Sequence, residues 1–374
     1  MYAAENHIQL LKNNLSNEVW ESGCEWVWQQ IFPLSMDLTG KHSNQTLQTQ
    51  KKWSSINTMD PAYDQYEKAR EFYRTHEYLA WIGEDESDEE TIRSASEEAL
   101  DQSENANSPA NTDSASAKIS DQPMIYPMQQ LMDYDFLMKH FYNVHTSTTA
   151  DRELMNAKNL LSKDLTLEKE DAPQILIYHT HSQESYKNSK TDENVVAVGQ
   201  KLTDLLTEKG WNVYHDTTVY DLAGGKLDRS RAYTYALEGI NEILARYPSI
   251  QVVLDIHRDG VGENVYLKTE IGGQPSARIM FFNGLSQTPE GPISYLANPF
   301  REDNLAFSLK LQLKAEEYYP GFTRKIYLKG LRYNQHLRAR SALVEVGAQT
   351  NTFEEACNAM MPLAELLDMV LQGK

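Results

Sequence analysis

From about residue 171 onward, short apolar runs alternate with longer stretches in which apolar residues recur every three or four positions. The run Ile-Leu-Ile-Tyr at 175–178 is typical of a strand buried on both faces of a parallel sheet. The stretch that follows has helical spacing, with Val195, Val198 and Leu202 on one face and Gly210 at its end. Such alternation predicts an α/β fold with a twisted, mainly parallel sheet of about six strands flanked by helices.

The same pattern predicts the bounds of the single elements. Strands are expected at 174–178, 211–215, 251–256, 277–282, 323–328 and 342–346. Helices are expected at 195–210, 228–247 and 303–319, each stopped by glycine or proline. A last helix is expected to begin at Thr352, because Thr352 and Glu355 have the spacing of a capping box.

The N-terminal part of the chain is less regular. Residues 1–83 are expected to form a helical extension. Residues 84–122 are rich in Asp and Glu and contain no aromatic residue, so we expect a disordered acidic linker there, with a functional acidic tract as the alternative. Apolar and aromatic residues return at 123–170, which predicts an arm that packs on the domain at 171–374.

Charge and composition narrow the classes of partner. The chain has 374 residues and a formal net charge of −19, so nucleic acid or an anionic membrane surface would repel it. No window reaches the roughly 18 apolar residues of a membrane span, and the first residues lack the features of a signal peptide, so we expect a soluble chain. Cys24 and Cys357 are too few for a disulfide scaffold or a four-thiolate zinc site.

Three predicted strands lead into residues that can bind a metal or move a proton. The first is followed by His-Thr-His-Ser-Gln-Glu-Ser at 179–185, the third contains Asp-Ile-His-Arg-Asp-Gly at 255–260, and the last contains Leu-Val-Glu-Val-Gly at 343–347. In α/β sheets, ligands bind beyond the carboxyl ends of the strands. We therefore expect these three motifs to converge in one crevice.

The convergent residues have the composition of a catalytic zinc site. His181, Glu184 and His257 would supply two imidazoles and one carboxylate, which leaves one coordination position of Zn²⁺ open to water. Glu345 breaks an apolar strand, so we expect it to be the general base that moves the proton. Arg258, next to His257, is the second residue that we expect to act in catalysis.

Several of these residues have alternative interpretations. Glu345 could instead form a structural ion pair with a nearby arginine, of which the candidates are Arg258, Arg338 and Arg340. Asp255 either orients the second nitrogen of His257 or simply ends the strand. Strand periodicity makes His179 point the same way as His181, so it is a second ligand candidate or a hydrogen-bond donor, whereas His215 is expected to be an ordinary surface residue.

Four motifs together resemble the stage II sporulation protein P family: residues 175–186, 226–233, 252–260 and 342–351. The resemblance extends from about Tyr134 to the C-terminus. It implies a fold like that of zinc-dependent N-acetylmuramoyl-L-alanine amidases, with His181 and His257 as zinc ligands, Glu184 as the third ligand and Glu345 as the general base. In that wider amidase family the acidic ligand stands at the start of the first helix, which here points to Glu193 instead.

The same resemblance implies a peptidoglycan hydrolase that cleaves the amide between N-acetylmuramic acid and L-alanine, together with endopeptidase activity on peptide cross-links. Members act in the septal space between mother cell and forespore during engulfment, with stage II sporulation proteins D and M as partners. They also carry an N-terminal membrane anchor, for which this sequence has no candidate segment. A zinc carboxypeptidase-like wall peptidase and a non-enzymatic peptidoglycan-binding scaffold are the alternatives.

Overall fold

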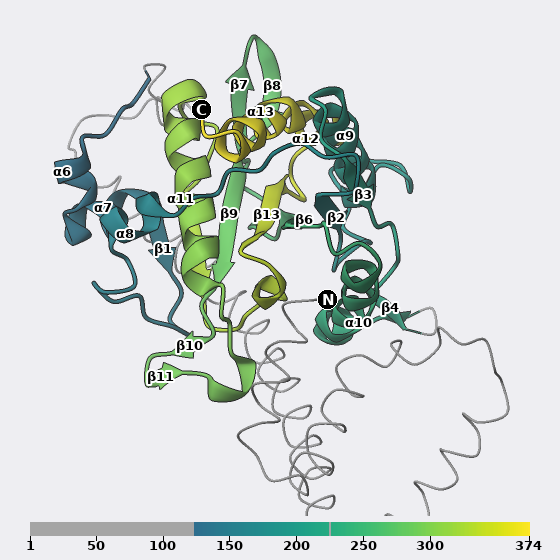
Figure 1. The fold of residues 1–374 in the computed structure, drawn as a ribbon. Helices are drawn as coiled ribbons and strands as arrows, with labels where there is room; N and C mark the ends of the chain where they lie inside the picture. The colour runs from purple at the N-terminus through teal and green to yellow at the C-terminus, as the bar shows by residue number, and fades with distance from the viewer. Residues whose placement is uncertain (1–122, 224–225) are drawn as a thin grey trace, which may run out of the picture. The chain divides into compact units, whose positions relative to one another are not determined.

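The computed structural model describes residues 123–223 and 226–374 (Figure 1). The extension expected at 1–83 and the linker expected at 84–122 lie outside the described residues. Among the described helices, none has the length and apolar character needed to cross a membrane.

The centre of the fold is a seven-stranded sheet in the order β1-β12-β9-β13-β6-β2-β3. All neighbours run parallel except β9 and β13, which pair antiparallel. The strands β13, β6, β2 and β3 therefore end at one edge of the sheet. Their bounds, in sheet order, are β1 Tyr142–Val144, β12 Ile326–Lys329, β9 Ile279–Gly284, β13 Arg340–Ala348, β6 Val252–Asp259, β2 Ile175–Tyr178 and β3 Val213–His215.

The two faces of the sheet bury different clusters, because successive side chains of a strand point to opposite faces. On one face, Ile175 and Ile177 join a core built with α9 (Val195–Glu208), α11 (Arg301–Tyr318), α12 (Phe353–Asn358) and α13 (Met360–Leu371). On the other face, Leu176 and Tyr178 pack with residues of α10 (Arg229–Arg246). Helices cover both faces of the sheet at β2, which explains why every residue of this strand is apolar or aromatic.

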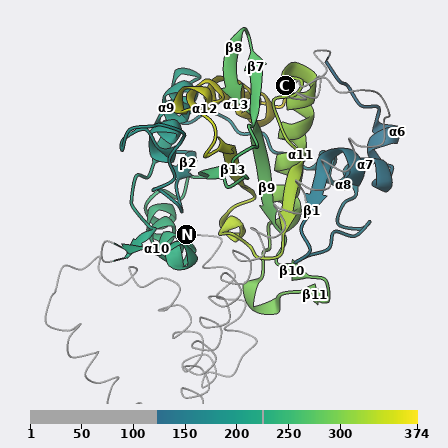
Figure 2. The same ribbon diagram turned by 180° about the vertical axis from the view of Figure 1, so that it is seen from behind.

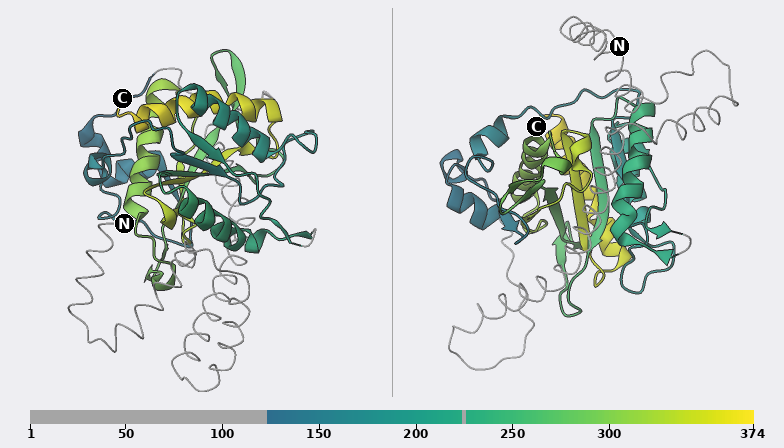
Figure 3. Two further views of the ribbon diagram at one scale, coloured as in Figure 1. Left: turned by 45° about the vertical axis from the view of Figure 1, so that its right-hand side comes forward. Right: turned by 90° about the horizontal axis from the view of Figure 1, so that it is seen from below.

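The arm at 123–170 contributes to the sheet itself. It contains α6 (Met128–Leu131), α7 (Tyr134–Phe141) and α8 (Ala157–Ser162), and its strand β1 pairs with β12. In Figures 1 to 3 the arm lies at one end of the sheet beside α11, and β3 lies at the other end. The arm is therefore part of the same folded unit rather than an addition to its surface.

Three short hairpins complete the described residues. They are β4 (Leu222–Ala223) with β5 (Lys226–Leu227), β7 (Lys268–Ile271) with β8 (Gln274–Ala277), and β10 (Gln287–Thr288) with β11 (Gly291–Pro292). The β7–β8 hairpin projects from the body of the fold (Figures 1 and 2). Single 3₁₀ turns lie at Ser294–Leu296 and Gln335–Leu337.

The expected elements are largely confirmed, with three differences. The sheet has seven strands because β1 adds an edge strand that its three residues did not reveal. The strand β9 runs antiparallel to β13, and this orientation depends on which distant segments of the chain pair. The capping box of Thr352 and Glu355 is present, but the last helix is divided at Ala359 into α12 and α13.

Candidate metal centre

Three side chains meet at the edge where β2 and β6 end. His181 and Glu184 lie on the turn after β2, and His257 lies in β6; one ligand atom from each lies within 4.8 Å of the others. The Nδ1 of His181 is 3.7 Å from Glu184 Oε1, and the Nδ1 of His257 is 3.5 Å from Glu184 Oε2. Glu184 and His257 are buried. The structure thus brings together the three residues that the sequence selects as ligands.

The second nitrogen of each imidazole faces an oxygen. Asp255 Oδ1 lies 2.9 Å from His257 Nε2, a close contact that is not aligned as a hydrogen bond, and Thr180 fixes Asp255 through its N–H at 2.9 Å and its hydroxyl at 2.6 Å. The Nε2 of His181 lies 3.4 Å from the carbonyl oxygen of Arg229. Each imidazole therefore has a supporting oxygen on its Nε2 and turns its Nδ1 to Glu184, which is the usual arrangement around a metal ligand.

Both oxygens of Glu184 accept hydrogen bonds from the protein. The guanidinium of Arg229 donates to Oε1 at 2.8 Å, and the backbone N–H of Arg258 donates to Oε2 at 2.9 Å. Burial would raise the pKa of Glu184, but His181 and His257 outweigh it and hold that pKa well below its usual range. Burial would likewise lower the pKa of His257, but Asp255 and Glu184 raise it well above its usual value. Without a metal, these interactions therefore favour the charged forms of Glu184 and His257.

The donor set fits zinc. Two imidazoles and one carboxylate form the three-ligand set of catalytic zinc sites, and each histidine has an oxygen within 3.4 Å of its second nitrogen. Arg229 and His257 compensate the buried negative charge of Glu184 and Asp255 in the metal-free protein, and a divalent cation would take over that compensation. His181, Glu184 and His257 are the residues that would hold it.

Glu345 lies on the strand next to His257. In the parallel pairing of β13 with β6, the Cα of Glu345 is opposite the Cα of His257. Burial, with Asp259 and Glu184 nearby, raises the pKa of Glu345 to about 8. Its Oε2 is buried and has no hydrogen-bond partner among the described residues. A buried carboxyl group without a partner, beside a ligand set, has the features of a proton-transfer group.

None of the arginines considered as structural partners forms an ion pair with Glu345 in the described part of the chain. Arg338 donates to the carbonyls of Ile250 and of its neighbour Leu337, and Arg340 donates to those of Leu165 and Thr166. The Nε of Arg258 donates to the carbonyl of Ser185 at 3.0 Å, and its Nη1 donates to its neighbour's carbonyl. Arg258 therefore fastens the turn that carries Glu184, and a direct role in catalysis stays a prediction.

Two histidines expected near or outside the site take other positions. The strand β2 ends at Tyr178, so strand periodicity does not extend to His181, and His179 is not one of the three clustered residues. Its Nε2 lies 2.9 Å from the Nε2 of His215, and its Nδ1 lies 3.0 Å from the carbonyl of Ile256. His215 is therefore half-buried and bonded rather than an ordinary surface residue.

Of the two acidic ligand candidates, only Glu184 lies in the cluster. Glu193 pairs with Lys190 at 2.8 Å on the loop before α9. Arg229, which supports both His181 and Glu184, was not singled out as a supporting residue from the sequence. The sequence feature that could have indicated the position of Arg229 is the N-cap of α10. Asp228 accepts a hydrogen bond from the N–H of Arg231, which places Arg229 at the first position of this helix.

The model of the stage II sporulation protein P family matches residues 43–368. Stage II sporulation protein P of Bacillus subtilis (strain 168) is 28% identical over 214 residues, which cover 52% of this chain and 50% of that protein. The chain thus spans about half the length of the curated relative that it matches.

Solved structures overlap with this chain only loosely. The CwlD amidase of Clostridioides difficile, in complex with the GerS lipoprotein, has a TM-score of 0.34 at 16% identity and covers 52% of this chain and 99% of its own. The N-acetylmuramyl-L-alanine amidase Ami1 of Mycobacterium abscessus has a TM-score of 0.29 at 14% identity, covering 54% and 97%. A Campylobacter jejuni nucleosidase reaches 0.27 at 8% identity, covering 54% and 100%, so overlap at this level does not distinguish functions.

Proposed function

Because the chain belongs to the stage II sporulation protein P family, we propose that it is a peptidoglycan hydrolase of sporulation, a zinc-dependent N-acetylmuramoyl-L-alanine amidase. The observation that carries the proposal is the group of His181, Glu184 and His257 with Glu345 on the adjacent strand. Two imidazoles, one ligating carboxylate and one separate carboxyl group are the parts that hydrolysis of an amide by a metal-dependent enzyme requires.

Zinc bound by the three ligands would supply Lewis-acid activation of water and of the amide carbonyl. The residues of the chain supply the rest. Glu345 accepts a proton from the attacking water and returns it to the leaving nitrogen, so that the acid and the free amine form with atoms balanced. Burial raises the pKa of Glu345 to about 8 in the metal-free protein, and the charge of a bound divalent cation would lower that pKa, which favours the ionised form that a base needs.

The surrounding arginines support an amidase over a zinc carboxypeptidase. A carboxypeptidase needs a cation that is available to hold the terminal carboxylate of its substrate. The guanidinium of Arg229 is paired with Glu184, and that of Arg258 is bound to two backbone carbonyls. Two of the three arginines that could hold a terminal carboxylate therefore serve the ligand turn, which supports cleavage within a larger substrate. The third, Arg231, has its Nε 3.9 Å from Asp228.

The proposal extends to the setting that the family implies. We propose that the chain acts in the septal space during engulfment, with stage II sporulation proteins D and M as partners and with endopeptidase cleavage as a second activity on the same substrate. Release of peptide with a free L-alanine amino group identifies the amidase, whereas an amino group freed within a cross-link identifies the endopeptidase.

The test uses the purified full chain, with zinc measured by elemental analysis and soluble peptide released from isolated peptidoglycan. We expect one zinc ion per chain and peptide release in the wild type, loss of both in His181→Ala, and zinc without release in Glu345→Gln. Glu193→Gln, on the other acidic candidate, is the matched control and is expected to behave as the wild type. Absence of zinc and of peptide release in the wild type would overturn the proposal.

A further inference from the structure

The candidate ligands His181 and Glu184 are the two ends of one tight turn. The N–H of Glu184 donates to the carbonyl of His181 at 3.2 Å, and this bond closes the turn that follows β2. A bond from the fourth residue back to the first is typical of a β-turn, whose end residues lie close together. The conformation of the two central residues, Ser182 and Gln183, therefore sets the separation of the two ligands.

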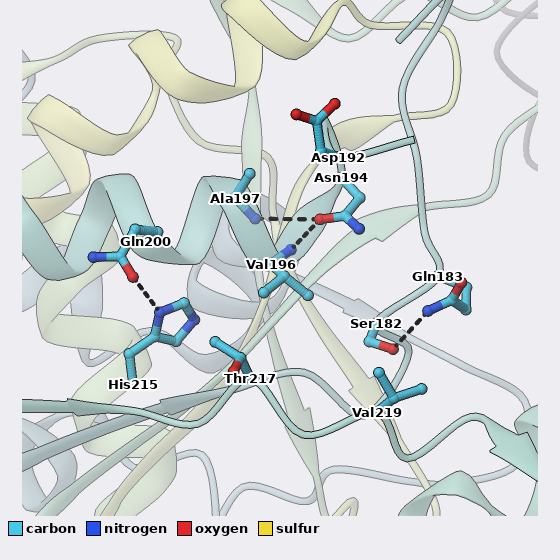
Figure 4. A pocket seen from close by; sticks show the side chains of 10 residues that line it. All are labelled: Ser182, Gln183, Asp192, Asn194, Val196, Ala197, Gln200, His215, Thr217 and Val219. Carbon is cyan, nitrogen blue, oxygen red and sulfur yellow. Dashed lines mark hydrogen bonds between the residues drawn. The ribbon is translucent and has the colours of Figure 1, made fainter. Parts of the chain in front are cut away.

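Asp221 holds both central residues of this turn. Its Oδ1 accepts from the hydroxyl of Ser182 at 2.7 Å, and its Oδ2 accepts from the backbone N–H of Gln183 at 3.1 Å. The side-chain amide of Gln183 donates in turn to Ser182 Oγ at 3.1 Å, and both residues lie on the wall of the surface pocket that Figure 4 draws. Each oxygen of one carboxylate thus fixes one of the two residues that space the ligands.

The carboxylate of Asp221 is buried without a cation. Asp221 and Ser182 are both 0% exposed. Within residues 123–223 and 226–374, the side-chain partners of Asp221 are the neutral donors of Ser182 and Gln183, and no ion pair joins them. Burial of such a charge is costly, but hydrogen bonds to a charged acceptor are stronger than bonds to a neutral one. The carboxylate therefore fixes the turn more firmly than a neutral side chain would.

The backbone of Asp221 holds a second support of the centre. Its carbonyl accepts from the N–H of Asp228 at 2.8 Å, at the base of the β4–β5 hairpin. Asp228 is the N-cap of α10, so the next residue is Arg229. The guanidinium of Arg229 donates to Glu184 at 2.8 Å, and its carbonyl oxygen lies 3.4 Å from His181 Nε2. One residue therefore joins the turn between the ligands to the helix start that supports them.

We propose that Asp221 is a positioning residue of the metal centre, which sets the spacing of His181 and Glu184 through Ser182 and Gln183 without touching the metal. This inference rests on the proposed function for its metal. A residue that only stabilised the fold would change the unfolding temperature and leave the metal site as it is. A positioning residue changes metal affinity and coordination in a chain that stays folded.

A second buried aspartate on the same loop provides the matched control. Asp216 is 6% exposed, and its carboxylate accepts from the hydroxyls of Thr218 and Tyr220, both at 2.6 Å. Asp216→Asn and Asp221→Asn each neutralise one buried carboxylate after β3, but only Asp221 bonds to the ligand turn. Ser182→Ala removes one of these bonds with a smaller change, which keeps the proposal testable if Asp221→Asn does not fold.

The metal arm of the test uses the full chain with Zn²⁺ in competition with a chelator, and with Co²⁺ for the visible spectrum that reports coordination. We expect Asp221→Asn to bind zinc about 10–100-fold more weakly, with an altered Co²⁺ spectrum. Ser182→Ala should show a smaller loss in the same direction. Asp216→Asn should bind zinc as tightly as the wild type, even where its Tm is lower. The double variant of Ser182→Ala and Asp221→Asn should match Asp221→Asn alone, because both residues act through one network.

Three results of this arm would contradict the proposal. The first is a zinc affinity and a Co²⁺ spectrum in Asp221→Asn equal to those of the wild type. The second is an equal loss of affinity in Asp216→Asn, which would show that any buried aspartate of the loop has the same effect. The third is a double variant whose loss is the product of the two single losses, since the residues would then act independently.

A second arm needs no metal. Amide hydrogen exchange at Gln183, measured by NMR on the metal-free chain, reports the bond from its N–H to Asp221. We expect exchange about tenfold faster in Asp221→Asn and unchanged in Asp216→Asn. Unchanged exchange in Asp221→Asn would overturn the hold of this residue on the turn. If the wild type binds neither metal but the exchange follows this pattern, the proposed function fails and the hold of Asp221 on the turn stands.

Discussion

Glu345 and His257 are direct neighbours in the parallel pairing of β13 with β6, and their Cα atoms are register partners. Paired strands lie about 4.8 Å apart, and partner side chains point to the same face of a sheet. A slip of one residue would send Glu345 to the opposite face, into the apolar layer that Val344 and Val346 occupy. The register of two strands therefore fixes the relation between the proposed base and a ligand.

This relation predicts that the length of the side chain at position 345 determines the rate of catalysis. Glu345→Asp withdraws the carboxyl group by one methylene while keeping its charge, and a displacement of about 1 Å in a catalytic group costs roughly a hundredfold in rate. We expect kcat for peptide release to fall by about that factor while the zinc content stays that of the wild type. Glu270→Asp, on the exposed side of β7, is the control, and an unchanged kcat in Glu345→Asp would contradict the assigned role.

Asp255 is predicted to set metal affinity without touching the metal. Its carboxylate faces His257 Nε2 at 2.9 Å and is anchored by Thr180. Loss of such a support typically weakens metal binding about 10–100-fold. Asp255→Asn should show this loss in a competition titration against a chelator, with circular dichroism to verify folding. A dissociation constant equal to that of the wild type would exclude this role.

Arg229 is predicted to stabilise the fold most when no metal is present. Its guanidinium compensates the buried charge of Glu184, a task that a bound cation would take over. Because the arginine side chain is 40% exposed, we expect Arg229→Gln to lower the free energy of unfolding of the metal-free chain by only about 1–2 kcal/mol. The zinc-induced rise in Tm should then exceed that of the wild type. Arg231→Gln on the same helix is the control, and equal zinc-induced shifts would count against the prediction.

Gly199 is predicted to be required for close packing of α9 on the histidine pair. A Cβ at this position would lie 2.5 Å from His179 Cε1 and 3.2 Å from His215 Nε2. The strain of overpacking, about 1–3 kcal/mol, outweighs the gain in helix propensity of about 1 kcal/mol. Gly199→Ala should therefore lower the unfolding midpoint in urea, whereas Thr207→Ala, exposed on the same helix, should not. A stabilised Gly199→Ala would show that the histidines can move.

The pair of His179 and His215 predicts a loss of folding stability at acidic pH. Burial, together with the neighbouring His215, lowers the pKa of His179 to about 4, whereas in the unfolded chain it is 6.5. Between these values the unfolded state binds more protons, so folding stability falls as the pH decreases, by up to about 3 kcal/mol from this residue. In urea titrations from about pH 7 to pH 4, His179→Asn should lose less stability than the wild type. Parallel pH profiles of the two proteins would contradict this account.

The sequence predicted that the three candidate ligands lie together, because its signals are local. His181, Glu184 and His257 each follow or end a strand that is apolar on both faces, and the carboxyl ends of such strands meet at one edge. The choice between Glu184 and Glu193 needed the path of the turn after β2. The expectation that His179 points the same way as His181 was wrong for the same reason, since the chain leaves the strand conformation at Tyr178.

What the sequence could not provide depends on contacts between distant segments. The antiparallel pairing of β9 with β13 and the addition of β1 follow from which strands meet in space. Arg229 and Glu184 are in contact although they are 45 positions apart in the sequence, and the sequence around each residue does not predict this contact. The candidate ligands and the position of Asp255 beside His257 were therefore predictable from the sequence, whereas the support that Arg229 gives was not.

The place of β1 at the end of the sheet has a practical consequence. A fragment that begins at residue 171 would keep the candidate metal ligands and Glu345 but would lose the strand that pairs with β12. The unpaired N–H and C=O groups of β12 would then offer a template for another chain, and such edges promote aggregation and strand exchange. Fragments that begin at residue 123 keep this edge covered, so the start of the fragment decides whether a preparation of the catalytic part stays monodisperse.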